Sequence, residues 1–267
     1  MLTRIISAAV LTLILVGSVI GGRISMFILS FTISAIGMFE LYRVVGVHKK
    51  PIGIVGYLIA AGYYALLWFG LMDYMMYFCV GSAILIMFTY VCSFATVKAS
   101  QAAFTFLGIY YVAIPLSFLY QIRMIDRYGI YLFILLFVCS WIADTFAYFT
   151  GVLIGRHKLV PRLSPKKSVE GAIGGVVGAA VIGLIYGLVL ENITGIKAGI
   201  PFTIISAIGA FISIFGDLAA SAIKRNFDIK DYGKLIPGHG GILDRFDSMI
   251  FVAPIIYIAA MLLAPLM

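Results

Sequence analysis

Charged residues are scarce in this chain of 267 residues. Nineteen lysines and arginines with eleven acids make up only 11% of the sequence, against about a quarter in soluble domains. This scarcity excludes an ordinary soluble domain, and it also excludes a disordered chain, which combines high charge with low hydrophobicity. Cysteine is equally rare: Cys79, Cys92 and Cys139 lie in apolar runs, and three cysteines cannot form a disulfide framework.

Hydrophobic residues dominate instead, at 63% of the chain, and the mean hydropathy is +1.12. Apolar runs of roughly 20 residues, the length that crosses a bilayer, recur from one end to the other. The sequence therefore predicts an all-α, polytopic integral membrane protein. Nine membrane helices are expected near residues 5–20, 24–43, 52–72, 74–95, 101–121, 128–150, 170–190, 201–224 and 248–265.

The distribution of positive charge predicts the orientation of these helices. With nine spans, 15 of the 19 lysines and arginines fall on the side of the N-terminus, and cytoplasmic loops carry the excess of such residues. We therefore expect the N-terminus and the loops 151–169 and 225–247 to be cytoplasmic, in a plasma membrane or the inner membrane of a bacterium. The positive charge suits anionic lipid or an anionic substrate; we expect no nucleic-acid partner.

The two halves of the chain differ in polar content. Residues 1–125 carry few ionisable groups and are expected to be a scaffold of membrane helices. Residues 126–267 contain two acids within apolar runs and both long polar loops. Function is therefore predicted in the second half.

Asp144 and Asp217 each lie within a predicted membrane helix. Each is six or seven residues from the cytoplasmic end, which at a rise of 1.5 Å per residue is roughly 10 Å deep. Matching depth on one side suggests a shared cavity. A carboxylate in hydrocarbon needs a cation, water or a partner, so the acids indicate function; a structural ion pair with a loop lysine or arginine is the alternative.

Two other features are expected to be structural. Glu40 has Arg43 three residues later, which favours an ion pair at the membrane surface. The small-residue spacings on the predicted seventh helix, Gly171 with Gly175 and Gly174 with Gly178, are typical of close helix packing in membranes.

The loop before that helix reads RLSPKKSVEGAIGG. Ser164-Pro165 is expected to form a turn, and Ser168 and Glu170 mark the start of a helix. Lys166 and Lys167 add positive charge. Lysines at a helix N-terminus can bind a polyphosphate, although on this loop alone a topological role explains them equally well.

The region after the eighth predicted helix is more specific. Asp217, Ser221 and Lys224 are spaced to share one helix face that leads from the buried acid to the surface. A glycine-rich turn follows at 237–241, where backbone N–H groups can approach a ligand closely. Asp244 and Asp247 share a face if the last helix begins beside them. The pattern indicates a metal–phosphate site.

The order of residues from Ser221 to Asp247 resembles the signature of the phosphatidate cytidylyltransferase family, the CDP-diacylglycerol synthases. The stretches SPKKSVEG and DTFAYFTGVLIGRHK also resemble that family, so the likeness covers roughly residues 140–250. One departure is Ala220, where many members carry an acid. The matching positions are Ser221, Lys224, Arg225, Lys230, Asp231, Gly233, Pro237, His239, Gly240, Gly241, Asp244, Arg245 and Asp247.

The resemblance implies transfer of a cytidylyl group from CTP to phosphatidic acid, with a divalent cation and release of pyrophosphate and CDP-diacylglycerol. It also suggests a homodimer in the lipid membrane. The acids point to a metal independently, because bare carboxylates would repel two polyanionic substrates and become useful by holding Mg²⁺. We expect Asp144 and Asp217, with Asp244 or Asp247, to hold it; a second cation is left open.

The remaining site residues are expected to contact phosphate groups. The basic residues would neutralise the triphosphate and the departing pyrophosphate; they are Lys166, Lys167, Lys224, Arg225 and Arg245. Ser168 and Ser221 would donate hydrogen bonds to phosphate oxygens. Asp231 is included among the site residues because it matches the family signature. His239 either orients a phosphate or protonates the leaving group, or it is a structural turn residue.

Two other functions fit part of the pattern. A CTP-dependent lipid kinase would use the same nucleotide but attack its γ-phosphorus and release CDP. An ion-coupled secondary transporter could use Asp144 and Asp217 as a relay, yet inverted repeats would place a matching acid pair in the first half, where there is none. A CDP-alcohol phosphotransferase needs an Asp-Gly pair, which the sequence lacks.

Overall fold

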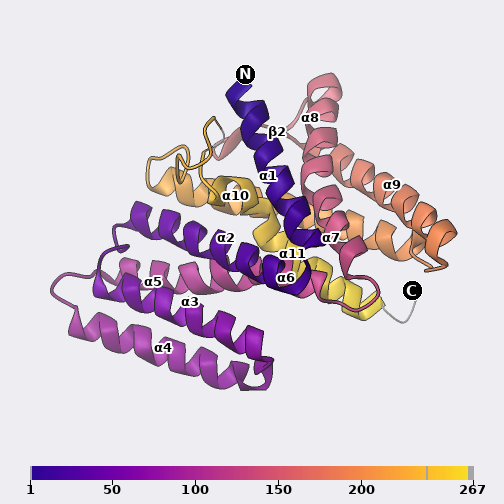
Figure 1. Cartoon of the computed structure of the whole chain (residues 1–267). Coiled ribbons are helices and arrows are strands. Elements are labelled where there is room, and N and C mark those ends of the chain that lie inside the picture. The colour runs from indigo at the N-terminus through magenta and orange to yellow at the C-terminus, as the bar shows by residue number, and fades with distance from the viewer. Residues whose placement is uncertain (1, 239, 264–267) are drawn as a thin grey trace. The chain divides into compact units, whose positions relative to one another are not determined.

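A computed structural model describes residues 2–238 and 240–263. Within them the regular elements are helices and one short hairpin (Figure 1), and a single isolated β-bridge joins Ile236 to Gly240. Eight of the described helical segments are long and apolar enough to cross a membrane. This confirms the polytopic all-α class. The first predicted span also forms a helix, but its qualifying apolar stretch, Ala9–Ile20, is shorter than the other eight.

The chain divides into two compact units that are not continuous in sequence. The first comprises the residues up to Tyr120 together with Ile229–Arg245, and the second comprises Gln121–Asp228 and the chain from Phe246 onward. The segment that carries most of the motif in the second polar loop thus belongs to the same unit as the N-terminal helices.

The elements of the first unit are mostly long helices. They are α1 (Leu2–Ile20), α2 (Gly22–Val45), α3 (Pro51–Phe69), the one-turn η1 (Met72–Tyr74), α4 (Met75–Cys92), α5 (Ala99–Leu107), the π-helical η2 (Gly108–Ala113) and α6 (Ile114–Arg123), which ends just beyond the unit. Helices α2 to α5 run side by side (Figure 1).

The interior of the first unit contains buried tyrosines with satisfied hydroxyl groups. Tyr64 Oη lies 2.7 Å from Ser34 Oγ and Tyr63 Oη lies 2.7 Å from Ser117 Oγ. Pairing these hydroxyls inside the bundle avoids the cost of an unsatisfied polar group in an apolar medium. Most large apolar side chains of α4 are exposed, as suits a helix that faces lipid.

The second unit is built around α9. Its elements are α7 (Gly129–Phe137), the π-helical η3 (Val138–Ile142), α8 (Ala143–Ile154), β1 (Lys158–Val160), β2 (Ser164–Ser168), α9 (Val169–Thr194) and α10 (Gly199–Asn226). The last helix, α11 (Leu243–Leu263), begins in the first unit and continues in the second.

Glycines allow α9 to lie close to both of its neighbours. A Cβ at Gly171 or Gly175 would meet backbone oxygens of α8 at 2.7 and 2.8 Å, and one at Gly187 would meet the carbonyl oxygen of Ala198 beside α10 at 2.5 Å. The prediction that these spacings serve helix packing is confirmed. A close α8–α9–α10 layer results, and it carries two of the three acids described next, Asp144 and Asp217.

Candidate active site

Three acids of the second unit are electrostatic neighbours. Asp144 lies in the first turn of α8, Asp217 lies in α10, and Asp247 lies in α11 with 9% of its surface exposed. The charge of Asp217 acts on both other acids, and the charge of Asp144 acts on Asp247. The structure therefore places Asp144 and Asp217 within electrostatic reach of each other, but the lining of the cavity described below includes Asp144 and not Asp217. Of the two further acids that the sequence offered, Asp247 acts electrostatically with this pair. We call these three residues the carboxylate cluster.

Two lysines balance part of this negative charge. Lys167 Nζ lies 2.5 Å from Asp217 Oδ2, and its charge also acts on Asp144. The charge of Lys224 acts on Asp247. Asp217 thus has a loop lysine as its partner, which is the alternative that the sequence left open. Among the described residues, no three Asp, Glu, His or Cys side chains already stand close enough to hold a metal ion.

The backbone geometry around the cluster explains how these acids approach one another. Gly216 precedes Asp217, and a Cβ there would lie 2.9 Å from the carbonyl oxygen of Asp247, so glycine lets α10 and α11 come close. Asp144 is the second residue after the π-helical turn η3. Such turns rotate the helix that follows and often occur at functional sites; they have no signature in this sequence.

The loop before α9 forms a β-hairpin whose last residue, Ser168, caps α9. Strands β1 and β2 pair antiparallel, and Ser168 Oγ accepts a hydrogen bond of 3.1 Å from Gly171 N, which confirms the predicted helix start. The expected turn at Ser164-Pro165 is wrong: both residues lie in β2, and the turn occupies residues 161–163. Extended backbone at 164–168 carries Lys166 and Lys167 along one strand.

Glu170 holds the entry to this hairpin. Its carboxylate accepts hydrogen bonds from the backbone N–H groups of Arg156 and His157, and His157 Nδ1 lies 2.6 Å from Glu170 Oε1. These contacts fix the chain between α8 and β1. They also give Glu170 a structural role beyond that of marking the helix start.

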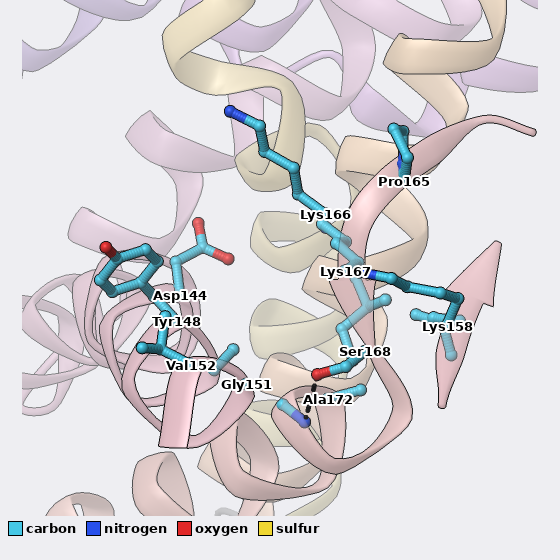
Figure 2. A pocket seen from close by; sticks show the side chains of 14 residues that line it. Asp144, Tyr148, Gly151, Val152, Lys158, Pro165, Lys166, Lys167, Ser168 and Ala172 are labelled. Atoms are coloured by element: carbon cyan, nitrogen blue, oxygen red, sulfur yellow. Dashed lines mark hydrogen bonds between the residues drawn. The ribbon is translucent and has the colours of Figure 1, made fainter. Parts of the chain in front are cut away.

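A cavity of about 480 Å³ lies between α8, the hairpin and α9. Figure 2 shows the carboxylate of Asp144 on the α8 side, pointing toward the strand that carries Lys166 and Lys167. The lining combines lysines with apolar side chains. Besides Asp144 it consists of Ala147, Tyr148, Gly151, Val152, Lys158, Leu159, Pro165, Lys166, Lys167, Ser168, Gly171, Ala172 and Ile214.

The segment Ile229–Arg245, which we call the signature loop, is fixed separately within the first unit. Gly238 and Gly240 have positive φ angles of 78° and 89°, as the glycine-rich turn requires. Asp244 Oδ2 accepts hydrogen bonds from Tyr232 N at 2.8 Å and Gly241 N at 2.9 Å. The last helix, α11, begins at Leu243, five residues before its expected start at residue 248, and it includes Asp244. His239 lies outside the described residues.

The other predicted residues occupy the ends of these segments. Ser221 and Lys224 are half-buried on α10, and Arg225 is exposed at its end. Asp231 and Arg245 are exposed in the signature loop. In the described part of the chain, the second unit therefore holds the carboxylate cluster with Lys166, Lys167, Ser168, Ser221, Lys224 and Arg225, and the first unit holds Asp231, Asp244 and Arg245.

The contacts of Glu40 and the position of Lys158 differ from what the sequence pattern predicts. Instead of the expected pair with Arg43, the carboxylate of Glu40 accepts hydrogen bonds from Ile242 N and Leu243 N. The partners of Glu40 lie some 200 residues away in the sequence, so local spacing could not reveal them. The one sequence signal of a special role was the position of an acid inside an apolar run. Lys158 lines the cavity from β1, and the hairpin that places it there was not foreseen.

The chain matches known proteins over most of its length. The model of the Cytidylyltransferase family matches residues 2–263. The chain is 34% identical over 271 residues to a phosphatidate cytidylyltransferase of Bacillus subtilis, covering 95% of each protein. It is 41% identical over 162 residues to one of Thermotoga maritima, covering 59% of this chain and 58% of that protein. The likeness therefore extends to the N-terminal helices, beyond the region that the motifs cover.

Proposed function

The chain belongs to the cytidylyltransferase family, and we propose that its carboxylate cluster and the surrounding lysines carry out the activity of that family. It is a phosphatidate cytidylyltransferase, a nucleotidyltransferase of phospholipid biosynthesis. The reaction joins the cytidylyl group of CTP to phosphatidic acid and yields CDP-diacylglycerol and pyrophosphate. The observation that carries the proposal is the convergence of Asp144, Asp217 and Asp247 with Lys167 and Lys224.

The donor set of the carboxylate cluster fits Mg²⁺. Its carboxylate oxygens are the hard donors that this ion prefers, and Asp217 already holds a cationic group, the ammonium of Lys167. We assign Asp144, Asp217 and Asp247 as the metal-holding residues. Asp244 stands apart because its Oδ2 already accepts two backbone N–H groups. A bound Mg²⁺ would neutralise phosphate oxygens and orient them.

The basic residues near the cluster would bind the triphosphate. Lys166 and Lys167 come from one strand, and Lys224 and Arg225 come from the end of α10. Positive charge fixed in place before the reaction stabilises the charge that develops on the departing pyrophosphate. Ser221, one turn before Lys224, can donate a hydrogen bond to the same groups.

The chemical step needs positioning more than a strong base. The second pKa of a phosphomonoester is about 6, so the phosphate of phosphatidic acid is already an anionic nucleophile at neutral pH. One of its oxygens attacks the α-phosphorus of CTP in line; a P–O bond forms there while the bond to the bridging oxygen of pyrophosphate breaks. The task of the protein is to hold two polyanions at this distance.

The mixed lining of the cavity suits a phospholipid head. Lys158 offers charge to a phosphate, while Tyr148, Val152 and Leu159 offer apolar surface to the start of the acyl chains. We propose that phosphatidic acid enters from the membrane beside Tyr148, which is exposed, as is Val152. The positive charge of the loops supports a site that faces the cytoplasm. We also propose a homodimer, which cross-linking in membranes would test.

The experiment is synthesis of labelled CDP-lipid from radioactive CTP and phosphatidic acid in detergent at several Mg²⁺ concentrations. Asp144→Asn, Asp217→Asn and Asp247→Asn should each lower turnover by about 10²-fold or more. The matched control is Asp73→Asn, which removes an exposed carboxylate in η1. Full activity in all three cluster variants would overturn the assignment, and release of CDP in place of a CDP-lipid would indicate a lipid kinase.

A further inference from the structure

Glu40 is a buried carboxylate far in sequence from the motifs of the chain. It lies in α2 with 3% of its surface exposed. Its two oxygens accept hydrogen bonds from Ile242 N at 3.1 Å and Leu243 N at 2.8 Å, at the start of α11. The first N–H groups of a helix have no partners inside that helix, and the helix dipole favours a negative charge beside them. Glu40 therefore caps α11 from another helix.

The neighbouring turn of α2 binds the same loop at a second point. Arg43 Nη2 donates a hydrogen bond of 2.8 Å to the carbonyl oxygen of Tyr232, whose side chain is buried. The N–H of Tyr232 donates in turn to Asp244 Oδ2. Glu40 and Arg43 thus hold the two ends of the signature loop, the one at Ile242 and Leu243 and the other at Tyr232.

Two glycines of the loop fit closely around Glu40. A Cβ added to Gly233 or to Gly241 would overlap the carboxylate of Glu40. Both positions belong to the motif that runs from Ser221 to Asp247. Their lack of a side chain is explained by the approach of Glu40, because neither has a positive φ that would otherwise demand glycine.

We infer that Glu40 is a positioning residue: it holds the signature loop and the first turn of α11 in the conformation that cytidylyl transfer requires, without touching either substrate. The inference rests on the proposed function, in which the signature takes part in catalysis. It gives the N-terminal helix α2 an indirect part in the reaction, through the signature loop. It also explains why a charged side chain is kept inside an apolar helix, where burial of a carboxylate is otherwise costly.

Glu40→Gln tests the inference because it changes almost no volume. The amide can still accept one N–H bond, but its NH₂ group faces the other N–H, so one hydrogen bond and the charge at the helix start are lost. Loss of such a charge-assisted bond should raise amide hydrogen exchange at residues 232–243 by about tenfold or more. Exchange in α3 and α4, within the same unit, should stay unchanged.

Activity is measured on the same preparations, as kcat and KM for both substrates. We expect kcat to fall about tenfold in Glu40→Gln with little change in KM for phosphatidic acid. Arg43→Met, which loosens the other end of the loop, should shift exchange and kcat in the same direction by a smaller factor. It also provides the test if Glu40→Gln does not fold. Glu40→Asp, which keeps the charge, should recover part of the activity, and Asp73→Asn is the matched control.

Three results would overturn the inference. They are unchanged exchange at residues 232–243 in both variants, an equal rise of exchange throughout the first unit, and a loosened loop with unchanged kcat. Failure of the proposed function is distinguishable from these results. It would appear as an Asp217→Asn enzyme with full activity, whatever the exchange in the signature loop.

Discussion

Replacing Lys167 by methionine should make the stability of the protein respond more strongly to Mg²⁺. The Nζ of Lys167 lies 2.5 Å from Asp217 Oδ2, and its charge also acts on Asp144. Methionine is similar in length and apolar, so packing along β2 is retained while the charge is lost. The three acids of the carboxylate cluster then repel one another more strongly. A divalent cation restores the missing attraction, so it should stabilise the variant more than the parent.

The size of the effect follows from the exposure of the pair. The side chains of Lys167 and Asp217 are 26% and 30% exposed, between the surface pairs worth about 0–1 kcal/mol and the buried pairs whose breakage costs about 3–5 kcal/mol. We expect Lys167→Met to lower the free energy of unfolding by about 1–2 kcal/mol. For a chain of this size, that lowers Tm by roughly 2–8 °C. Mg²⁺ at ten times its Kd should raise the free energy of unfolding by about 1.4 kcal/mol.

The assay is thermal unfolding of purified protein in detergent, with and without Mg²⁺. Lys167→Met, Asp217→Asn and the double variant form a cycle that isolates the coupling between the two side chains. Lys49→Met serves as control because Lys49 is exposed in a loop of the first unit. Equal stabilisation by Mg²⁺ in the parent and in Lys167→Met would refute the idea that lysine and metal share the same carboxylates.

Three further predictions concern the site and its orientation. Lys224→Ala or Arg225→Ala should lower kcat/KM for CTP by about 10²-fold. If only the affinity for phosphatidic acid fell, the assignment of these residues to CTP would be wrong. Gly216→Ala should impair activity because its Cβ would lie 2.9 Å from the carbonyl oxygen of Asp247, whereas Gly81→Ala, with nothing within 4 Å, should not. Finally, Val160→Cys, with Cys79, Cys92 and Cys139 replaced, should resist an impermeant thiol reagent in intact cells; labelling without lysis would contradict the cytoplasmic hairpin.

Local features of the sequence predicted the helices and one pair of acids well. Apolar runs are long because the bilayer demands it, so the spans were predicted to within a few residues of the observed helices. Asp144 and Asp217 could be placed together because depth in a membrane helix is a count of residues from its end. Ser168 as a helix cap followed from residue type and position alone.

Features that depend on distant contacts could not be predicted. The partner of Asp217 was left open between a cation and a loop lysine, because Lys167 is 50 residues away and reaches Asp217 through a hairpin that apolar patterning does not reveal. The π-helical turn before Asp144 likewise has no local signature. Glu40 was paired with Arg43 because that residue is one turn away, whereas the actual partners are backbone groups of α11.

In the proposed mechanism, the charge of the cluster would link metal binding to nucleotide binding. The carboxylates of Asp144, Asp217 and Asp247 repel a triphosphate, whereas the ammonium groups of Lys167 and Lys224 attract it. A bound Mg²⁺ would weaken the repulsion from the carboxylates, so it would raise the affinity for CTP. Because coupling between two ligands is reciprocal, CTP must raise the affinity for Mg²⁺ by the same factor as Mg²⁺ raises the affinity for CTP. Lys167, released from Asp217 by the metal, would then be available to a phosphate oxygen, which gives the lysine a different partner before and after substrate binding.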